Sequence, residues 1–206
     1  MRARWLRREG AEGLVVIFGG WSLGPAPFAH LSGAQDVLFL DDWREVPPDL
    51  ALPQGYRERV LLAFSFGVAA AGHWLAQAGR DPFTRKVAVN GTLAPACPRH
   101  GIAPEQVRAT ADQLSPQSLA RFAARAGAAP PEAPDLDALR SELHATLDRG
   151  AAPETRFDRI LISRRDRIFP PSAMYRAWQS QAAAIRDIDA PHCPFARWSN
   201  WAEIAE

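Results

Sequence analysis

A serine at the end of a short apolar run is the first residue in this chain whose position suggests chemistry. Ser65 follows the mostly apolar residues 59–64 and precedes an alanine-rich segment at 68–75. Ala63 and Gly67 lie two positions to either side of it, so the segment has the pattern A-x-S-x-G. A sharp turn from a buried strand into a helix exposes a serine hydroxyl as a nucleophile, and it needs small residues at those two positions. The pattern therefore predicts a nucleophilic serine, and an ordinary turn serine is the alternative.

A nucleophilic serine needs a histidine as its base and a carboxylate that orients the histidine. Asp166 lies just past the apolar run 160–163, in a loop that two prolines close, and His192 is the only histidine beyond it. Serine, acid and histidine follow one another along the chain in the order found in α/β-hydrolases. We therefore predict that Ser65, Asp166 and His192 form a proton-relay triad. The alternative for Asp166 is a surface ion pair with a neighbouring arginine.

The charge that develops on a substrate oxygen would need two backbone N–H donors. Phe66, directly after Ser65, is expected to supply one, and the loop after an early strand is expected to supply the other. Trp21 follows two consecutive glycines in such a loop, and glycines let the backbone approach a substrate closely. We predict the Trp21 and Phe66 amides as the two donors, with a plain tight turn and a core tryptophan as the alternative.

Short apolar runs bounded by turn residues predict the strands that must position these groups. They lie at residues 13–21, 37–42, 59–64, 86–92, 157–163 and 184–188, and the basic segment 1–9 is a candidate edge strand. Helical or proline-rich connections separate most of them. This alternation is typical of an α/β protein with a mostly parallel central sheet.

No strand pattern is present between residues 92 and 157. Amphipathic segments divided by proline and glycine instead predict helices at 104–114, 116–126 and 136–147, with Ser115 and Asp135 at the starts of the last two. An all-helical insert between two strands would lie over the carboxyl ends of the strands, where open α/β sheets bind ligands. We therefore predict a single domain over residues 1–206 with a helical lid at about 93–156. A helical connection packed on the sheet is the alternative.

The composition favours one globular domain and gives no sign of a nucleic-acid or membrane partner. The chain has 206 residues, of which 47% are hydrophobic and 23% charged, and its net charge is +1. The two cysteines, Cys97 and Cys193, form no cluster with metal-ligand spacing, so we expect neither a metal nor another cofactor. No apolar stretch is long enough for a signal peptide or a membrane span, so a cytoplasmic location is expected.

Several motifs, taken together, resemble one family. They are FGGW at 18–21, FSFGV at 64–68, AVNGTLAP at 88–95, GIAP at 101–104, DRIFPP at 166–171 and HCPF at 192–195. This combination is similar to the BioG-type pimeloyl-[acyl-carrier protein] methyl ester esterases, and the likeness runs from about residue 14 to residue 198. The Asn-Gly-Thr stretch at 90–92, with the following Gly-Ile, is its most specific part.

The resemblance implies an α/β-hydrolase fold and a serine esterase of biotin synthesis that hydrolyses the methyl ester of pimeloyl-[acyl-carrier protein]. By position, Ser65 matches the family's nucleophile, Asp166 its acid and His192 its base. Ala63 departs from the usual glycine of the serine turn, and its extra methyl group bears on how tight that turn can be. Two other functions stay open: a serine esterase or thioesterase acting on another short acyl ester, and a non-catalytic α/β module that binds an acyl group or a partner.

An acyl-carrier protein is the partner that the resemblance implies. Carrier proteins are acidic and their prosthetic arm carries a phosphate, so arginines on the lid are expected to face them. Arg121 and Arg125 are four residues apart on one predicted helix and share a face, so they are the first candidates, followed by Arg108 and Arg140. The alternative is that these arginines are solvated side chains in a chain whose only lysine is Lys86.

Overall fold

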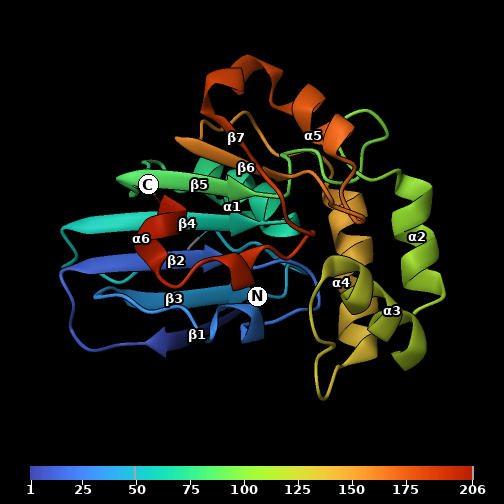
Figure 1. Cartoon of the computed structure of the whole chain (residues 1–206), viewed down its shortest axis with the longest axis horizontal. Helices are drawn as coiled ribbons and strands as arrows, with labels where there is room; N and C mark the ends of the chain where they lie inside the picture. Colours follow the sequence, from blue (N-terminus) through green and yellow to red (C-terminus); the bar gives the residue numbers. More distant parts are fainter. Residues whose placement is uncertain (49, 206) are drawn as a thin grey trace.

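Seven strands form one sheet in the computed structural model, which describes residues 1–48 and 50–205. The strands are β1 (Arg2–Arg7), β2 (Gly13–Phe18), β3 (Asp36–Asp41), β4 (Glu58–Phe64), β5 (Arg85–Val89), β6 (Arg159–Ser163) and β7 (Ile185–Ile188). Their order in the sheet is β1-β3-β2-β4-β5-β6-β7, and each pair of neighbours is parallel except β1 with β3 (Figure 1). The expected mostly parallel sheet, with an edge strand from the start of the chain, is confirmed.

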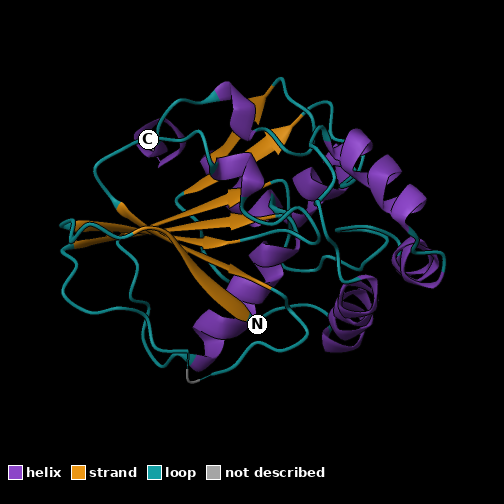
Figure 2. Cartoon of the chain, turned by 90° about the horizontal axis from the view of Figure 1, so that it is seen from below, coloured by secondary structure: helices purple, strands orange, loops and turns teal. Residues whose placement is uncertain are grey.

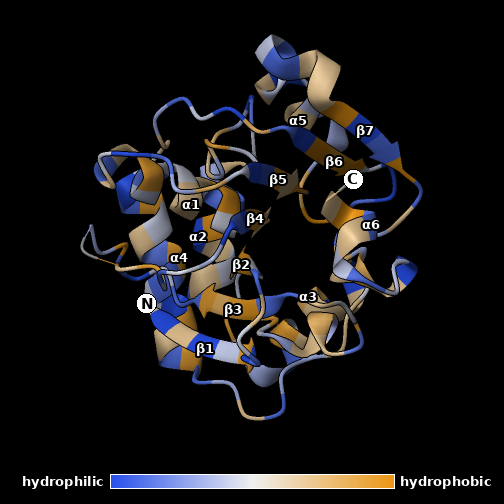
Figure 3. Ribbon diagram, turned by 90° about the vertical axis from the view of Figure 1, so that its left-hand side faces the viewer, coloured by the Kyte–Doolittle hydropathy of each residue, from blue (hydrophilic) through white to orange (hydrophobic). Residues whose placement is uncertain are grey.

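The inner strands are buried on both faces because successive side chains point to opposite sides of the sheet. In β2, Val16 and Phe18 belong to one hydrophobic core, and Val15 and Ile17 belong to the other. All four are almost completely buried. In Figure 3, which looks along the strands, the central strands are coloured mostly as hydrophobic and the loops around them mostly as hydrophilic.

Helices cover both faces of the sheet, as the view in Figure 2 shows. The first core lies under α1 (Phe66–Gln77) and α5 (Pro171–Ala177), which contribute Trp74 and Met174. The second core lies under α6 (Trp201–Ala205), which contributes Trp201 and Ile204. Helices therefore pack against both faces of the sheet. The carboxyl edge of the sheet is left for the insert and for the loops that carry the predicted site.

The insert between β5 and β6 contains the three expected helices. They are α2 (Pro104–Asp112), α3 (Pro116–Ala126) and α4 (Leu136–Arg149), and they lie beyond the carboxyl ends of the parallel strands (Figure 1). Both predicted starts are confirmed: the Ser115 hydroxyl accepts from the Ser118 N–H at 3.2 Å, and the Asp135 carboxylate accepts from the Ala138 N–H at 3.0 Å. None of the helices described is both long enough and apolar enough to cross a bilayer.

One strand ends earlier than the sequence predicts. The expectation that a strand runs to residue 92 is wrong, because β5 ends at Val89 and the chain leaves the sheet at Asn90, which has a φ of 47°. The apolar run that begins at Gly13 is stopped by two glycines, and β2 accordingly ends at Phe18. The short helices α5 and α6 are also not expected from the sequence, since segments of five to seven residues show too few turns for a helical period.

Candidate active site

Ser65 lies at the sharp turn between β4 and α1. Its φ of 57° is in the left-handed range, which is uncommon for a residue with a side chain and is typical of strained turns at functional sites. The Ser65 N–H donates to the carbonyl of Val89 at 2.9 Å, so the turn is fixed to the end of the neighbouring strand. The strand-to-helix turn expected from the sequence is therefore present.

The two small neighbours of Ser65 have different reasons to be small. A Cβ atom at Gly67 would lie 2.1 Å from the Phe18 carbonyl oxygen and 2.6 Å from that of Gly19, so only glycine fits beside this backbone. Ala63, by contrast, is completely buried in the sheet core, where its methyl group is accommodated. The alanine that departs from the usual pattern thus leaves the turn intact, and the close approach occurs on the glycine side.

The structure brings the three predicted triad side chains into one row. His192 Nε2 lies 3.1 Å from Ser65 Oγ, and His192 Nδ1 lies 2.7 Å from Asp166 Oδ2. A carboxylate can only accept hydrogen bonds, so Nδ1 carries the proton it donates to Asp166 and Nε2 is free to accept from the serine hydroxyl. The imidazole and the carboxylate are buried, with side-chain exposures of 1% and 0%. This is the arrangement in which a histidine can remove a serine proton.

Backbone and aromatic groups hold the acid and the base in place. The other Asp166 oxygen accepts from the N–H groups of Ile168 and Phe169, each at 2.8 Å, so this carboxylate is not the surface partner of a neighbouring arginine. The Phe169 ring lies parallel to the His192 ring with centroids 6.3 Å apart, and the Phe64 ring lies 5.0 Å away. The imidazole therefore has little freedom to rotate.

The predicted oxyanion donors lie at the same place in the fold. Phe66 is the first residue of α1, so its N–H has no acceptor within the helix. A Cβ atom at Gly20 would lie 3.0 Å from the Ser65 Cβ, which places the Gly20–Trp21 backbone beside the serine. The alternative interpretation, a core tryptophan, is correct for the Trp21 side chain, which belongs to the first hydrophobic core.

The Trp21 side chain joins this loop to the helical insert. Its indole N–H donates to the carbonyl of Leu139 in α4 at 2.9 Å, and its ring meets the Phe122 ring of α3 edge to face at 4.9 Å. The next residue, Ser22, has a φ of 69°, and the Leu23 N–H donates to the Trp21 carbonyl across this tight turn at 3.0 Å. The position of the predicted donor thus depends on contacts with two helices of the insert.

A cavity of about 410 Å³ opens beside the serine hydroxyl. Trp21, Ser65 and Phe66 line it on the sheet side, and side chains from all three insert helices line the opposite side. The insert side combines apolar side chains, among them Val107 from α2, Phe122 from α3 and Leu143 from α4, with the polar side chains of Gln106, Thr110 and Arg125. The cavity therefore offers both apolar surface and polar groups beside the serine hydroxyl.

Arginines stand around this cavity. Arg125 and Arg167 line it, and Arg125 with Arg121 lines an adjoining groove of about 300 Å³ between α2 and α3. Arg108 is exposed on α2 but lines neither space. In the described part of the chain, these four guanidinium groups make no ion pair and are open to solvent.

Two arginines have contacts that the sequence pattern does not specify. Arg140 donates to the carbonyls of Ala111 and Leu114 at 3.2 and 3.4 Å and pairs with Asp137, so it fastens α4 to the end of α2 while its side chain stays 36% exposed. Arg167 is the cavity residue that the sequence pattern does not single out. The sequence feature that could have identified Arg167 is its position directly after Asp166, because the loop that carries the acid borders the site.

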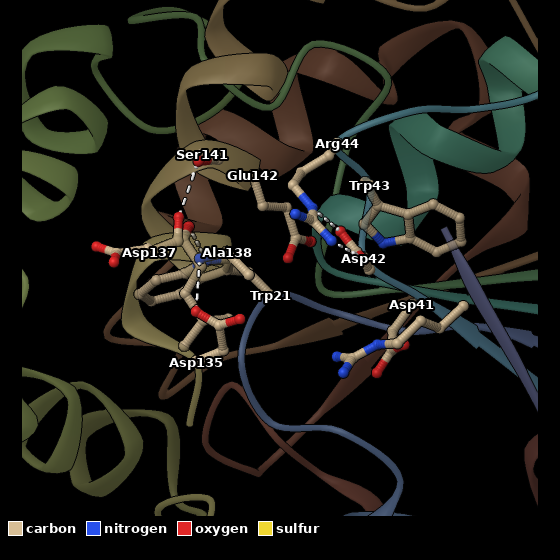
Figure 4. A network of polar contacts seen from close by, with 12 residues as sticks. Trp21, Asp41, Asp42, Trp43, Arg44, Asp135, Asp137, Ala138, Ser141 and Glu142 are labelled. Atoms are coloured by element: carbon tan, nitrogen blue, oxygen red, sulfur yellow. Dashed lines mark hydrogen bonds and ion pairs between the residues drawn. The ribbon is translucent and has the colours of Figure 1, made fainter. Parts of the chain in front are cut away.

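A second buried polar group lies on the insert, away from the triad. Glu142 of α4 is 4% exposed, and Figure 4 shows its carboxyl group pointing toward the Asp42–Arg44 pair at the end of β3. Burial raises the pKa of Glu142 to about 8; the N–H of Trp43 donates to it and opposes this rise, while repulsion from Asp42 and Asp41 adds to it. Asp42 itself is held by Arg44 through two hydrogen bonds of 2.7 Å, which lower the pKa of Asp42.

Comparison with known proteins finds one family and several structures that are similar to this chain. The family model described as "Pimeloyl-ACP methyl esterase BioG" matches residues 1–204. The crystal structure of BioG from Haemophilus influenzae superposes with a TM-score of 0.88 at 25% identity and covers all of both chains. A bromoperoxidase from Bacillus anthracis superposes with a TM-score of 0.63 at 14% identity, over 94% of this chain and 90% of its own.

A curated relative is also similar in sequence. It is the malonyl-[acyl-carrier protein] O-methyltransferase of Bacteroides fragilis (strain 638R), 29% identical over 201 residues, which are 91% of this chain. The chain spans 40% of the length of that relative. The structural neighbours are α/β-hydrolase fold proteins, so the fold class expected from the sequence is confirmed.

Proposed function

The chain belongs to the pimeloyl-ACP methyl esterase family BioG, and on this basis we propose that it is a serine carboxylesterase of biotin synthesis. The proposed reaction hydrolyses the methyl ester of pimeloyl-[acyl-carrier protein] to pimeloyl-[acyl-carrier protein] and methanol. One observation supports it above the others: Ser65 Oγ, His192 and Asp166 are joined by contacts of 3.1 and 2.7 Å at the wall of an acyl-sized cavity. No metal or other cofactor has a role in the proposed chemistry.

In the first half of the reaction, the serine replaces methanol on the acyl group. His192 Nε2 takes the proton of Ser65 Oγ while the oxygen attacks the carbonyl carbon of the methyl ester. The N–H groups of Trp21 and Phe66 stabilise the oxygen that becomes negative, and loss of one such donor costs about 10²- to 10³-fold in rate. The imidazolium then gives its proton to the leaving methoxide, so that methanol departs and an acyl-serine ester remains.

In the second half, water releases the acyl group. His192 takes a proton from a water molecule, the hydroxide attacks the acyl-serine carbonyl, and the same two amides stabilise the oxygen. The imidazolium returns its proton to Ser65 as the ester bond breaks. Asp166 keeps its charge throughout and holds the imidazole in the tautomer that has a free Nε2.

We assign the insert, about residues 93–156, the role of a lid over the acyl chain. Its helices supply apolar side chains to the cavity wall, and Trp21 links them to the predicted oxyanion loop through Leu139 and Phe122. A lid in this position would cover the methyl-ester end of the acyl chain while the carrier stays outside. The proposed location of the enzyme is cytoplasmic, where a carrier-linked substrate would be available.

The acidic carrier is proposed to bind at the arginines around the cavity mouth. Arg121 and Arg125 are the main candidates, with Arg108 on the neighbouring helix and Arg167 across the cavity. Guanidinium groups suit phosphate and carboxylate because they donate two parallel hydrogen bonds. The phosphate of the prosthetic arm would lie near Arg125, which borders both the cavity and the adjoining groove.

Charge reversal of Arg121 and Arg125 is expected to weaken the use of the carrier-linked substrate. The double variant Arg121→Glu/Arg125→Glu should raise KM for pimeloyl-carrier methyl ester by about tenfold or more, since the loss of about 1.4 kcal/mol of binding corresponds to a factor of ten. Hydrolysis of p-nitrophenyl butyrate, which has no phosphate and no carrier, should change far less. The measurement is steady-state kinetics on both esters.

The control for charge alone is Arg57→Glu, because Arg57 is exposed at the opposite end of the sheet, before β4. It should leave KM for the carrier substrate unchanged. Equal losses on both esters, or an equal loss in the control, would contradict the proposed carrier surface. The proposed reaction itself is tested by offering wild-type protein pimeloyl-carrier methyl ester, and a failure to release methanol would reject it.

A further inference from the structure

Asn90 makes three short hydrogen bonds that join the end of β5 to the loop of His192. Its side-chain N–H₂ group donates to the backbone carbonyl of His192 at 2.6 Å and to the Ser163 hydroxyl at 2.7 Å. Its side-chain oxygen accepts from the backbone N–H of Ser163 at 2.7 Å. This assignment of amide oxygen and nitrogen is the one that pairs each donor with an acceptor, since a backbone N–H can only donate and a carbonyl can only accept.

The burial and the backbone conformation of Asn90 suit these contacts. Asn90 is 1% exposed and has a φ of 47°, a left-handed conformation that asparagine tolerates better than most residues. Its own N–H donates to the carbonyl of Leu161 at 3.0 Å, so the backbone stays attached to β6 while the side chain reaches the loop. A buried amide with both of its donors used is costly to replace, because each group that loses its partner stays buried.

The loop of His192 has a second anchor, and that one belongs to the insert. The N–H of Cys193 donates to the carbonyl of Ala126 at the end of α3 at 2.7 Å. The neighbouring Gly127 lies against Pro191, where a Cβ atom would come within 2.5 Å of the proline ring. Any movement of α3 would therefore act on the histidine loop, whereas Asn90 holds the same loop from the rigid sheet.

We propose that Asn90 is a positioning residue, which fixes the main chain of His192 to the sheet so that Nε2 stays within reach of Ser65 Oγ. The inference rests on the proposed function, because it assigns His192 the role of base. The hydrogen bonds of the Asn90 side chain go to the His192 backbone carbonyl and to Ser163, and none of those described goes to Ser65 Oγ or to the His192 ring. Through Ser163, which begins the turn to Asp166 and accepts its N–H at 3.2 Å, Asn90 also joins the acid loop to the base loop.

Two variants of Asn90 test the positioning role. Asn90→Gly keeps the left-handed backbone but removes the side chain, and Asn90→Asp keeps the shape but replaces the donor to His192 with an oxygen that faces the carbonyl oxygen. Each is expected to lower kcat for p-nitrophenyl butyrate by about 10²-fold, as displacement of a reacting group by about 1 Å does, with little change in KM. The rate at which a fluorophosphonate labels Ser65 should fall in parallel.

Thr92→Val is the matched control, because Thr92 lies two residues further along the same buried segment. Its hydroxyl has no hydrogen-bond partner in the described part of the chain, so the isosteric valine removes a polar group without breaking a contact. It should keep the wild-type kcat. Ser163→Ala, which retains the bond from Asn90 to His192, should lose far less than either Asn90 variant.

The outcomes separate this inference from the proposed function. If wild-type protein neither hydrolyses the ester nor labels, the proposed function fails by itself. If the wild type is active but both Asn90 variants keep its kcat, with or without a higher KM, the positioning role is overturned. The proposed esterase function then still stands. A loss of kcat no larger than the loss of folded protein, measured by near-UV circular dichroism in the same samples, also overturns it.

Discussion

Ester hydrolysis is expected to fall about 10⁵- to 10⁶-fold when Ser65 is replaced by alanine, because the nucleophile of a serine hydrolase acts as a unit with its base. The Ser65 Oγ atom is the only group of the row that faces the cavity and can form the acyl ester. With the methyl group of alanine in its place, His192 has no hydroxyl to deprotonate. Residual turnover would come from direct attack of water on the ester, with the Trp21 and Phe66 amides stabilising the oxygen that becomes negative. This route is far slower than the one through an acyl-serine ester.

A fluorophosphonate probe measures the same expectation without a carrier protein. Wild-type protein should be labelled and Ser65→Ala should not, while Ser141→Ala should label like the wild type. Ser141 is an exposed serine on α4 whose hydroxyl is used in a bond to the Asp137 carbonyl, so it controls for reaction at any serine. Undiminished labelling of Ser65→Ala would place the nucleophile elsewhere, and an unlabelled wild type would favour the non-catalytic acyl-binding module.

The parts of the site that the sequence predicts are those that local signals specify. The small neighbours of Ser65, the proline-closed loop of Asp166 and the last histidine of the chain each stand next to a recognisable strand end. Parallel strands bring their carboxyl ends to one edge of a sheet, so residues that follow those ends are expected to meet. The structure brings Ser65, Asp166 and His192 together at that edge, and their catalytic roles stay a prediction.

What the sequence leaves out depends on contacts between distant segments. Arg140 lies on the expected helix, but only packing of α4 against the end of α2 decides that it binds carbonyls there. Glu142 occupies an ordinary position in an amphipathic helix, and its burial follows from the way α4 meets the end of β3. The end of β5 at residue 89 likewise depends on the left-handed backbone of Asn90, for which asparagine is a weak local signal.

The stability of the protein is expected to fall between pH 5 and pH 8 because of Glu142. Burial raises the pKa of this carboxyl group to about 8 in the folded protein, against 4.5 for the group in its ordinary state. A group whose folded pKa is raised stabilises the fold fully below the unfolded value, and this stabilisation is lost as pH rises toward the folded value. The loss between pH 5 and pH 8 should be about 3 kcal/mol from this residue alone.

The charges around Glu142 explain why its proton is retained. Asp42 and Asp41 at the end of β3, both labelled in Figure 4, repel a negative carboxylate. Arg2 of β1 attracts it. Arg44 is held by Asp42, and Arg149 of α4 donates to the carbonyls of Trp43 and Arg44, so neither forms an ion pair with Glu142 in the described structure. The carboxyl group is therefore favoured in its neutral form, with one oxygen that has no hydrogen-bond partner among the described residues.

Glu142→Gln is expected to remove this pH dependence, since the amide has nearly the same shape and cannot ionise. Its Tm should be close to that of the wild type at pH 5 and on the order of 10 °C higher at pH 8, because 1 kcal/mol shifts the Tm of a domain of this size by about 2–4 °C. Thermal unfolding followed by circular dichroism at both pH values measures the difference, and Glu132→Gln, at an exposed position in the connector before α4, is the control. If the difference in Tm between Glu142→Gln and the wild type were the same at pH 5 and pH 8, Glu142 would be ionised at both pH values. The proposed raised pKa of Glu142 would then be wrong.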